Sequence, residues 1–327
     1  MTQENKIGLF REKVLQHLDN RFTTKAPERL YEPMAYILGL GGKRMRPVLT
    51  LMSVEVFGGQ IEQALDAALA IEIFHNFSLV HDDIIDDAPL RRGKTTVHEK
   101  WDVNTGILSG DAMLIKSYQF FEGYEPTTFK KLVSLFSQTA IEVCEGQQYD
   151  VDFEARNNVT IPEYLKMIEY KTAVLVATSL KMGAIIAGAN ETDADAIYSF
   201  GRELGIAFQL QDDFLDAFGD PKTFGKQVGG DIIENKKTIL YLKALEYASS
   251  EDRAELEKLF SEKQKDTEYK IERAKEIFKQ SGSVDYLKQA IAGYTQEAFL
   301  SLEKISAPEE NKKLLRRFGE ELMNRSI

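Results

Sequence analysis

Apolar residues recur at helical spacing along most of the 327-residue chain, and no stretch shows the strict alternation that is typical of strands. Breaks containing glycine or proline separate these runs, and Pro27 and Pro33 frame a short early helix. The pattern predicts further helices over residues 8–22, 48–57, 61–87, 104–123, 127–152, 161–189, 193–218, 231–247, 250–263, 266–281, 284–302 and 309–324. No linker or shift in composition divides them, so we expect one all-α domain over residues 1–327.

The predicted helix over residues 61–87 ends in an acidic cluster, with four aspartates within six residues. In a helix, Asp82 and Asp86 are one turn apart and point the same way. Like charges on one face repel unless a cation lies between them. Mg²⁺ binds through few carboxylates and shares its coordination sphere with phosphate oxygens, which makes it the natural guest. A solvated acidic helix end is the alternative interpretation.

A second cluster lies far along the chain, inside the predicted helix over residues 193–218. It repeats the spacing of the first, with two adjacent aspartates and a third one turn from the leading one. Two such clusters favour a multi-metal site over two unrelated solvated helix ends. The candidate metal ligands are Asp82, Asp83, Asp86, Asp212, Asp213 and Asp216.

Helical geometry, at about 100° per residue, gives each cluster a stripe of neighbours. The first stripe holds Ile71, His75, Ser78, Asp82 and Asp86, with Phe74 at its edge. The second stripe holds Gly205, Gln209, Asp212 and Asp216. If the stripes face each other, the site has a metal-binding mouth and an apolar throat. Such a shape suits a ligand with a phosphate or diphosphate head and a hydrocarbon tail.

The net charge is −11, from 52 acidic and 41 basic residues, which argues against nucleic acid as a partner. Local bases nevertheless flank the first acidic cluster. Four of these are candidates for a second, metal-free anion pocket, namely Lys43, Arg46, Arg91 and Arg92. We assign Arg44 to surface solubility instead.

The single cysteine, Cys144, allows no internal disulfide and suits a reducing cytoplasm. We expect it to be a small buried apolar residue. The first residues lack an apolar core behind a basic start, so no secretory signal is expected. The longest apolar run, residues 172–189, contains Lys181 and is short for a membrane span, which favours a buried helix and a cytoplasmic protein without an integral membrane segment.

Together these residues resemble the trans-isoprenyl diphosphate synthases, the polyprenyl synthetase family. The resemblance extends from about residue 41 to residue 237. The matching segments are GGKRMRP at 41–47, HDDIIDD at 81–87, RRG at 91–93, EGQQYD at 145–150, KTA at 171–173, FQLQDDFLD at 208–216, GK at 225–226, GGD at 229–231 and KKT at 236–238.

The resemblance implies an all-α bundle around a deep central cavity, usually a homodimer, that condenses isopentenyl diphosphate with an allylic diphosphate. It implies that the aspartates hold up to three Mg²⁺ ions with the allylic diphosphate. Further contacts to that diphosphate would come from Arg91, Lys171, Lys226 and Lys236. Contacts to isopentenyl diphosphate would come from Gly42, Lys43, Arg46, His75 and Arg92. Thr172 and Gln209 would line the zone where the carbocation forms.

In this family, bulk just before the first acidic cluster is related to product length. Phe74 and Phe77 are bulky here and Ser78 is small. The resemblance links that pattern to short all-trans products, C15 to C20, with C20 favoured. Helix geometry places Phe77 about 140° from the Asp82 stripe, so Phe74 is the better plug on geometry.

Three alternatives stay open at this point. A class I terpene cyclase would share the first cluster but would more often carry a different second metal motif. A non-catalytic subunit of a synthase would tend to lose acidic clusters that are intact here. A helical scaffold or Ca²⁺-binding protein would show no Mg²⁺-dependent diphosphate binding.

Overall fold

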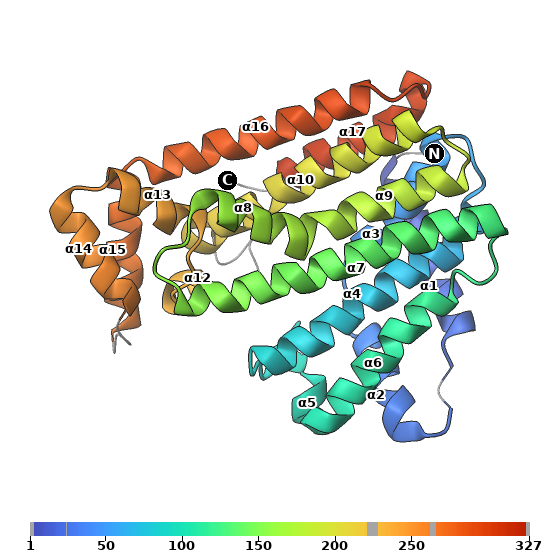
Figure 1. Cartoon of the computed structure of the whole chain (residues 1–327), viewed down its shortest axis with the longest axis horizontal. Coiled ribbons are helices and arrows are strands. Elements are labelled where there is room, and N and C mark those ends of the chain that lie inside the picture. Colours follow the sequence, from blue (N-terminus) through green and yellow to red (C-terminus); the bar gives the residue numbers. More distant parts are fainter. Residues whose placement is uncertain (1–2, 24, 221–227, 262–265, 325–327) are drawn as a thin grey trace. The chain divides into compact units, whose positions relative to one another are not determined.

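The computed structural model describes residues 3–23, 25–220, 228–261 and 266–324, and in them the all-α prediction is confirmed (Figure 1). The one sheet in these ranges is the two-residue hairpin of β1 (Leu90–Arg91) and β2 (Lys94–Thr95), where the sequence predicts a polar loop. Both turn residues, Arg92 and Gly93, have positive φ. That backbone is typical of the tight two-residue turns that join antiparallel strands.

The chain forms two compact units, each built from segments far apart in the sequence. Unit 1 comprises Met1–Ser137, Thr178–Ala194 and Ala307–Leu314, and unit 2 comprises Gln138–Ala177, Asp195–Ser306 and Leu315–Ile327. Four helices contribute to both, namely α7 (Pro126–Ala155), α9 (Val174–Ile186), α10 (Glu191–Phe218) and α17 (Glu309–Met323). The single domain over residues 1–327 stays a prediction.

Unit 1 is organised around α4 (Leu65–Ile85), whose residues 67–74 are all buried. A 3₁₀ turn, η1 (Ile61–Ala64), precedes it, and α6 (Val103–Gln119) packs along it (Figure 1). The remaining helices are α1 (Gln3–Arg21), α2 (Glu28–Gly39), α3 (Met45–Val56) and the one-turn α5 (Val97–Lys100). This packing buries the apolar stripe that predicted the long helix and leaves its acidic end at the surface.

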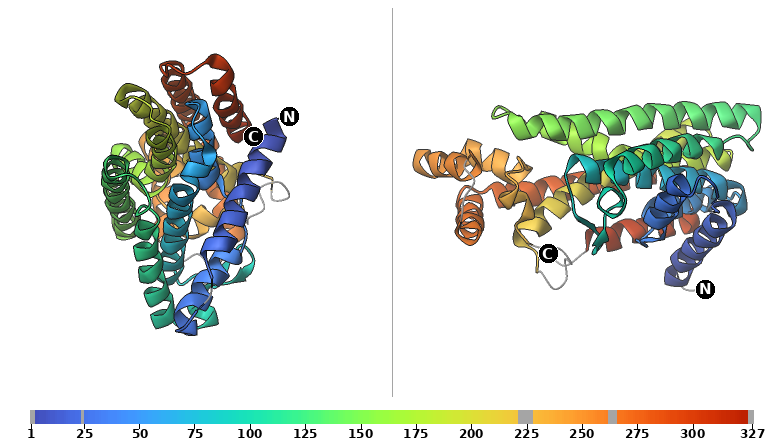
Figure 2. Two further views of the ribbon diagram at one scale, coloured as in Figure 1. Left: turned by 90° about the vertical axis from the view of Figure 1, so that its right-hand side faces the viewer. Right: turned by 90° about the horizontal axis from the view of Figure 1, so that it is seen from below.

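Unit 2 contains α8 (Ile161–Ile168), which a capping box between Thr160 and Glu163 begins as the sequence suggests. It continues with α12 (Gly230–Ile233), α13 (Ile239–Tyr247), α14 (Ser250–Ser261), α15 (Thr267–Gln280) and α16 (Ser283–Glu303). Helices α13, α14 and α15 pack on one another (Figure 2). Their apolar faces join those of α8 and α10 in one core.

Two predicted helices are interrupted. The helix over residues 161–189 changes into the π-helical segment η2 (Glu169–Ala173), which lies between α8 and α9. The helix over residues 231–247 is broken between α12 and α13, where Asn235 has a φ of 61°. Both interruptions occur at the candidate site described below, as is common for π-bulges and left-handed residues.

Candidate active site

The first aspartate cluster occupies the C-terminal end of α4. Asp82 is partly exposed and Asp86, the C-cap residue, is exposed. Asp83 is buried, and its Oδ1 accepts hydrogen bonds from Nε of Arg91 at 2.7 Å and from Nη2 at 2.6 Å. Asp82 and Asp86, which helical spacing places on one side, are therefore accessible, whereas Asp83 holds the arginine that ends β1.

A basic cluster lies beside this helix. Nη1 of Arg46 is 3.2 Å from Nε2 of His75. Burial, reinforced by the charges of Arg46, Arg92, Arg91 and Arg44 in that order, lowers the pKa of His75 well below its ordinary value. His75 is therefore neutral at pH 7 and accepts from Arg46 through Nε2.

Arg46 keeps a donor available. Burial lowers the pKa of Arg46 to about 10, a value at which it still carries its charge at pH 7. Its Nε atom is buried and has no hydrogen-bond partner among the described residues. A buried, charged donor without an acceptor is unfavourable, and an anion would satisfy it.

Gly42 brings the turn before α3 close to Arg92. Gly42 has a φ of 119°, and a Cβ atom there would lie 2.8 Å from Cζ of Arg92. Nη1 of Arg92 also donates to the carbonyl of Gly41. The site requires glycine at position 42 because any side chain would push the guanidinium away. The structure thus brings together Gly42, Arg46, His75, Arg91 and Arg92 as predicted, and Lys43 is exposed on the same turn.

The assignment of Arg44 to surface solubility was wrong. Arg44 is only 5% exposed and has left-handed backbone with φ 50°. It pairs with buried Glu72 and donates to the carbonyl of Leu38. Asn76 donates to Glu72 Oε1 at 2.8 Å, so the carboxylate is held from two sides. Arg44 therefore anchors the turn that carries Lys43 and Arg46. The prediction of a buried Cys144 was also wrong, since that residue is exposed.

An aromatic cluster surrounds the chain-length candidates. The ring of Phe74, which is fully buried, contacts those of Phe77 at 5.4 Å and Phe136 at 5.1 Å between centroids. Phe77 also packs edge-on against His81 at 4.9 Å. Phe74 and Phe77 therefore form one aromatic layer within unit 1, whereas Ser78 turns its hydroxyl back to the carbonyl of His75 at 2.9 Å.

Unit 2 has its own pocket, of about 130 Å³, lined by α7, α8, η2, α10 and the segment between α12 and α13. Lys171, Thr172, Gln209 and Lys236, four residues singled out in the sequence, all reach it. Asp213 lines it as well, and Asp216 lines an adjoining smaller pocket. The structure thus assembles most of the predicted residues of this half around one cavity.

A chain of hydrogen bonds runs through the pocket. Thr172 Oγ1 donates to Gln209 Oε1 at 3.3 Å, and Gln209 Nε2 lies 3.4 Å from Asp213 Oδ1. The hydroxyl of Tyr164 donates to the other oxygen of Asp213. Burial, and then the charge of Asp231, raises the pKa of Asp213 well above its ordinary value, although both hydrogen bonds oppose the shift. These bonds fix the orientation of the Gln209 amide.

Lysines neutralise the acidic wall of this pocket. Lys171 pairs with Asp150. Burial alone would lower the pKa of Lys236, but the carboxylates of Asp231, Glu234 and Asp150 together raise it above its ordinary value. Lys236 is therefore charged at pH 7, and both lysines lie at one cavity.

Asp216 organises the loop after α10. Its Oδ2 accepts from the backbone N–H of Asp231 at 3.0 Å, and its carbonyl accepts from Gly229 at 2.6 Å. Asp212 is partly exposed on the same helix. Sequence reasoning missed the roles of Asp150, Tyr164 and Asp231, although two of these lie in segments that matched the family. Lys226 lies outside the described residues.

Residues 27–278 match the family described as polyprenyl synthetase. The chain belongs to that family. It is 37% identical over 282 residues to a geranylgeranyl diphosphate synthase of Methanosarcina mazei, covering 86% of this chain and 85% of the relative. It is 36% identical over 304 residues to a geranylfarnesyl diphosphate synthase of Natronomonas pharaonis, covering 88% and 87%.

Comparison with solved structures points to the same family. A crystal structure of a geranylgeranyl pyrophosphate synthase has a TM-score of 0.94 and 52% identity, covering 98% of this chain and 99% of its own. The chain is therefore a prenyltransferase, a short-chain isoprenyl diphosphate synthase with the isoprenoid synthase fold. This result sets aside the terpene cyclase, the non-catalytic subunit and the Ca²⁺-binding scaffold. Among the described residues, no helix is both long and apolar enough to cross a membrane.

The residues present fit a hard divalent metal. A structure of the synthase from Corynebacterium glutamicum, 28% identical with a TM-score of 0.86 and covering 99% of this chain and 100% of its own, contains isoprenyl diphosphate and magnesium. In this chain the two aspartate clusters offer four carboxylates that are at least partly exposed, namely Asp82, Asp86, Asp212 and Asp216. An all-oxygen donor set of this kind suits Mg²⁺ or Ca²⁺.

Proposed function

We propose that this enzyme condenses isopentenyl diphosphate with an allylic diphosphate to make a C20 all-trans prenyl diphosphate. One observation carries the proposal. The basic cluster of Arg46, His75 and Arg92 offers a metal-free anion site, beside a helix whose end carries outward carboxylates. A reaction with two diphosphate substrates needs a metal-free anion site as well as a metal-dependent one, whereas a reaction with one diphosphate does not.

Four partly or fully exposed aspartates would hold the metal, namely Asp82, Asp86, Asp212 and Asp216, with up to three Mg²⁺ ions. When bound, Mg²⁺ neutralises charge that develops on the leaving diphosphate. Asp83 and Asp213 are buried against their own hydrogen-bond donors, so we assign them positioning roles instead of the direct ligation expected from the sequence.

The remaining side chains bind and orient the substrates. Lys171, Lys236 and Arg91 hold the allylic diphosphate as its C–O bond breaks, and their charges stabilise the transition state. The dipoles of Thr172 and Gln209 face the resulting cation. Gly42, Lys43, Arg46, His75 and Arg92 hold isopentenyl diphosphate while its double bond forms the new C–C bond. The proton lost in the last step passes to the released diphosphate, so no protein base is required.

An apolar face of α6 favours a homodimer. Val103, Ile107, Leu108 and Ile115 are 47%, 41%, 61% and 63% exposed, and helical spacing places them within about 140° of one another. A monomer would leave this face in water. Sedimentation velocity should show a dimer that Leu108→Glu dissociates, with Lys130→Glu on the surface of α7 as the control. A monomeric parent protein would contradict this arrangement.

The C20 product rests on the aromatic layer and on the 52% identical geranylgeranyl pyrophosphate synthase. The relatives include both geranylgeranyl and geranylfarnesyl synthases. Phe77→Ala, or the conservative Phe74→Leu, should lengthen the product by at least one isoprene unit. Phe121→Ala is the matched control, because Phe121 contacts Phe136 but lies outside α4. Chromatography of the dephosphorylated products would show the outcome, and unchanged products from both α4 variants would refute the plug.

The direct test incubates the protein with labelled isopentenyl diphosphate, Mg²⁺ and each of three allylic primers. We expect extension to C20 with at least one primer and no product in excess chelator. Failure with all three primers would refute the proposed reaction. A C25 product would refute only the proposed length.

A further inference from the structure

His98 is an unusual buried residue in unit 1. Its side chain is 4% exposed, and neither ring nitrogen has a hydrogen-bond partner among the described residues. A neutral imidazole carries one donor and one acceptor, and burying both without partners is unfavourable. None of the roles assigned above uses this side chain. An unpartnered imidazole in such surroundings is open to a ligand.

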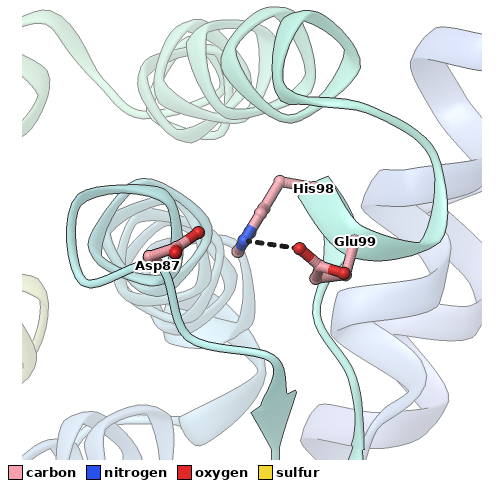
Figure 3. A group of neighbouring side chains, drawn as sticks. All are labelled: Asp87, His98 and Glu99. Carbon is pink, nitrogen blue, oxygen red and sulfur yellow. Dashed lines mark ion pairs between the residues drawn. The ribbon is translucent and has the colours of Figure 1, made fainter.

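Two carboxylates flank the ring (Figure 3). Nε2 of His98 is 3.8 Å from Oε1 of Glu99, and one ligand atom each of Asp87, His98 and Glu99 lies within 4.8 Å of the others. Both carboxylates are exposed and can adjust, whereas the imidazole is fixed by burial. Asp87 has left-handed backbone, φ 48°, a strained conformation that often marks functional sites.

We propose that Asp87, His98 and Glu99 form a second metal site, selective for a borderline transition-metal ion of the Zn²⁺ class. Imidazole nitrogen and carboxylate oxygen are both ligands that Zn²⁺ accepts, and three protein ligands would leave a fourth position for water. The nitrogen ligand distinguishes this site from the all-oxygen aspartate clusters, which suit Mg²⁺. The two exposed carboxylates would have to move toward the buried imidazole to close around the ion.

The position of the site gives it a consequence for substrate binding. Asp87 and His98 are the two ends of the segment that carries Arg91 and Arg92 on the β-hairpin. The segment is already drawn together, because Thr96 Oγ1 donates to the carbonyl of Ala88 at 2.8 Å. A bound ion would tie these ends and stiffen the hairpin.

The test uses untagged full-length protein with Asp82→Asn and Asp86→Asn, which removes the neighbouring carboxylate pair. Zinc affinity is measured by competition with a chromophoric chelator, and Co²⁺ binding by visible absorption. We expect one zinc equivalent per chain, which His98→Gln, Asp87→Asn and Glu99→Gln each weaken at least about tenfold, since loss of an outer partner alone weakens metal binding about 10–100-fold. His17→Gln is the control, because His17 has a carboxylate partner in Asp66 and should not change the affinity.

A second measurement follows the hairpin itself. In the protein with Asp82→Asn and Asp86→Asn, Zn²⁺ should slow tryptic cleavage after Arg91, Arg92 and Lys94. When Glu99→Gln is added, Zn²⁺ should leave the cleavage unchanged. Because Asp87 and Glu99 are exposed, their variants should fold even if His98→Gln does not. Unchanged zinc affinity in both Asp87→Asn and Glu99→Gln would overturn the proposal. This outcome is independent of whether the enzyme makes the proposed product.

Discussion

In unit 1 the middle aspartate, Asp83, is buried against the guanidinium of Arg91, whereas in unit 2 its counterpart Asp213 is buried against a tyrosine hydroxyl and an amide. The partner of Asp83 carries a full charge. The partners of Asp213 are neutral, and burial together with the charge of Asp231 raises its pKa. The two clusters therefore have the same residue spacing, but the middle aspartate is paired with a charged group in one and with neutral groups in the other. The first fixes an arginine and the second fixes the dipole of Gln209.

The largest expected effect tests whether both clusters serve one reaction. Asp82→Asn and Asp212→Asn should each lower kcat/KM at least about 10³-fold, or ~4 kcal/mol, because each removes a carboxylate that we propose as a metal ligand in the reaction. Turnover of labelled isopentenyl diphosphate measures both. Asp111→Asn, an exposed residue on α6, is the control. A large loss from one variant and none from the other would separate the two clusters functionally.

Stability should distinguish the two middle aspartates. Asp83→Asn leaves Arg91 without its counter-charge and should lower the free energy of unfolding by about 3 kcal/mol, near the lower limit for a buried pair because Arg91 is 25% exposed. Asp213→Asn should change it by less than about 1 kcal/mol, because an amide can still accept from Tyr164. Urea unfolding of the two variants gives the comparison. Equal losses of unfolding free energy in the two variants would mean that the charge on the aspartate's partner does not affect stability.

Each unit also has a buried cation that anchors its loop, Arg44 in unit 1 and Lys270 in unit 2. Lys270 is 2% exposed and donates to the Ile233 carbonyl at 3.2 Å and to Asn235 at 2.6 Å. Lys270→Met should loosen the loop that carries Lys236 and lower kcat/KM about thirtyfold, or ~2 kcal/mol.

The predicted loss should appear mainly as a higher KM for the allylic substrate, because Lys236 would be misplaced and not removed. Lys275→Met on the same helix is the matched control, since the ion pair of Lys275 is with Glu272 within α15. Steady-state kinetics of both variants, with thermal melting as a check on folding, make the measurement. Equal KM values in the two variants would show that Lys270 has no positioning role.

The smallest effect concerns His75, which faces four arginines and has a lowered pKa. Below its ordinary value of about 6.5, the unfolded chain takes up a proton that the folded chain refuses. Stability should therefore fall by about 1 kcal/mol from this group between pH 7 and pH 5.5. In His75→Asn this part of the change in unfolding free energy should be absent. Urea unfolding at pH 7 and at pH 5.5 measures the change. The same change in His75→Asn would mean that His75 is protonated in the folded protein.

Most of the fold was predictable because apolar periodicity is a local signal. The buried stretch of α4 follows directly from it, and the start of α8 follows from the equally local capping box of Thr160 and Glu163. The break at Asn235 does not, because Asn235 is held by Lys270, which is 35 residues away in the sequence. The short hairpin was missed because two-residue strands carry no alternation.

For the candidate site too, local sequence signals predicted some features and long-range contacts decided others. Spacing indicated that Asp82 and Asp86 share one side of the helix, and the local bases indicated an anion pocket with Arg46 and Arg92. His75 was identified by its place on the Asp82 stripe and by the family resemblance. Composition could not show that Arg44 is buried, because its partner Glu72 lies on another helix. Long-range pairs of this kind decide which member of a motif faces a ligand and which supports it.

The π-helical segment η2 adds one residue to a turn just where Lys171 and Thr172 reach the pocket. Gly146 on α7 lies against it, and a Cβ atom there would be 2.3 Å from the backbone nitrogen of Lys171. Deleting one residue from η2 would restore a regular helix and rotate everything on one side of the deletion by about 100° relative to the other. A regular helix would therefore turn the ammonium group of Lys171 or the hydroxyl of Thr172 away from the pocket. The irregular turn is what allows both groups to reach it.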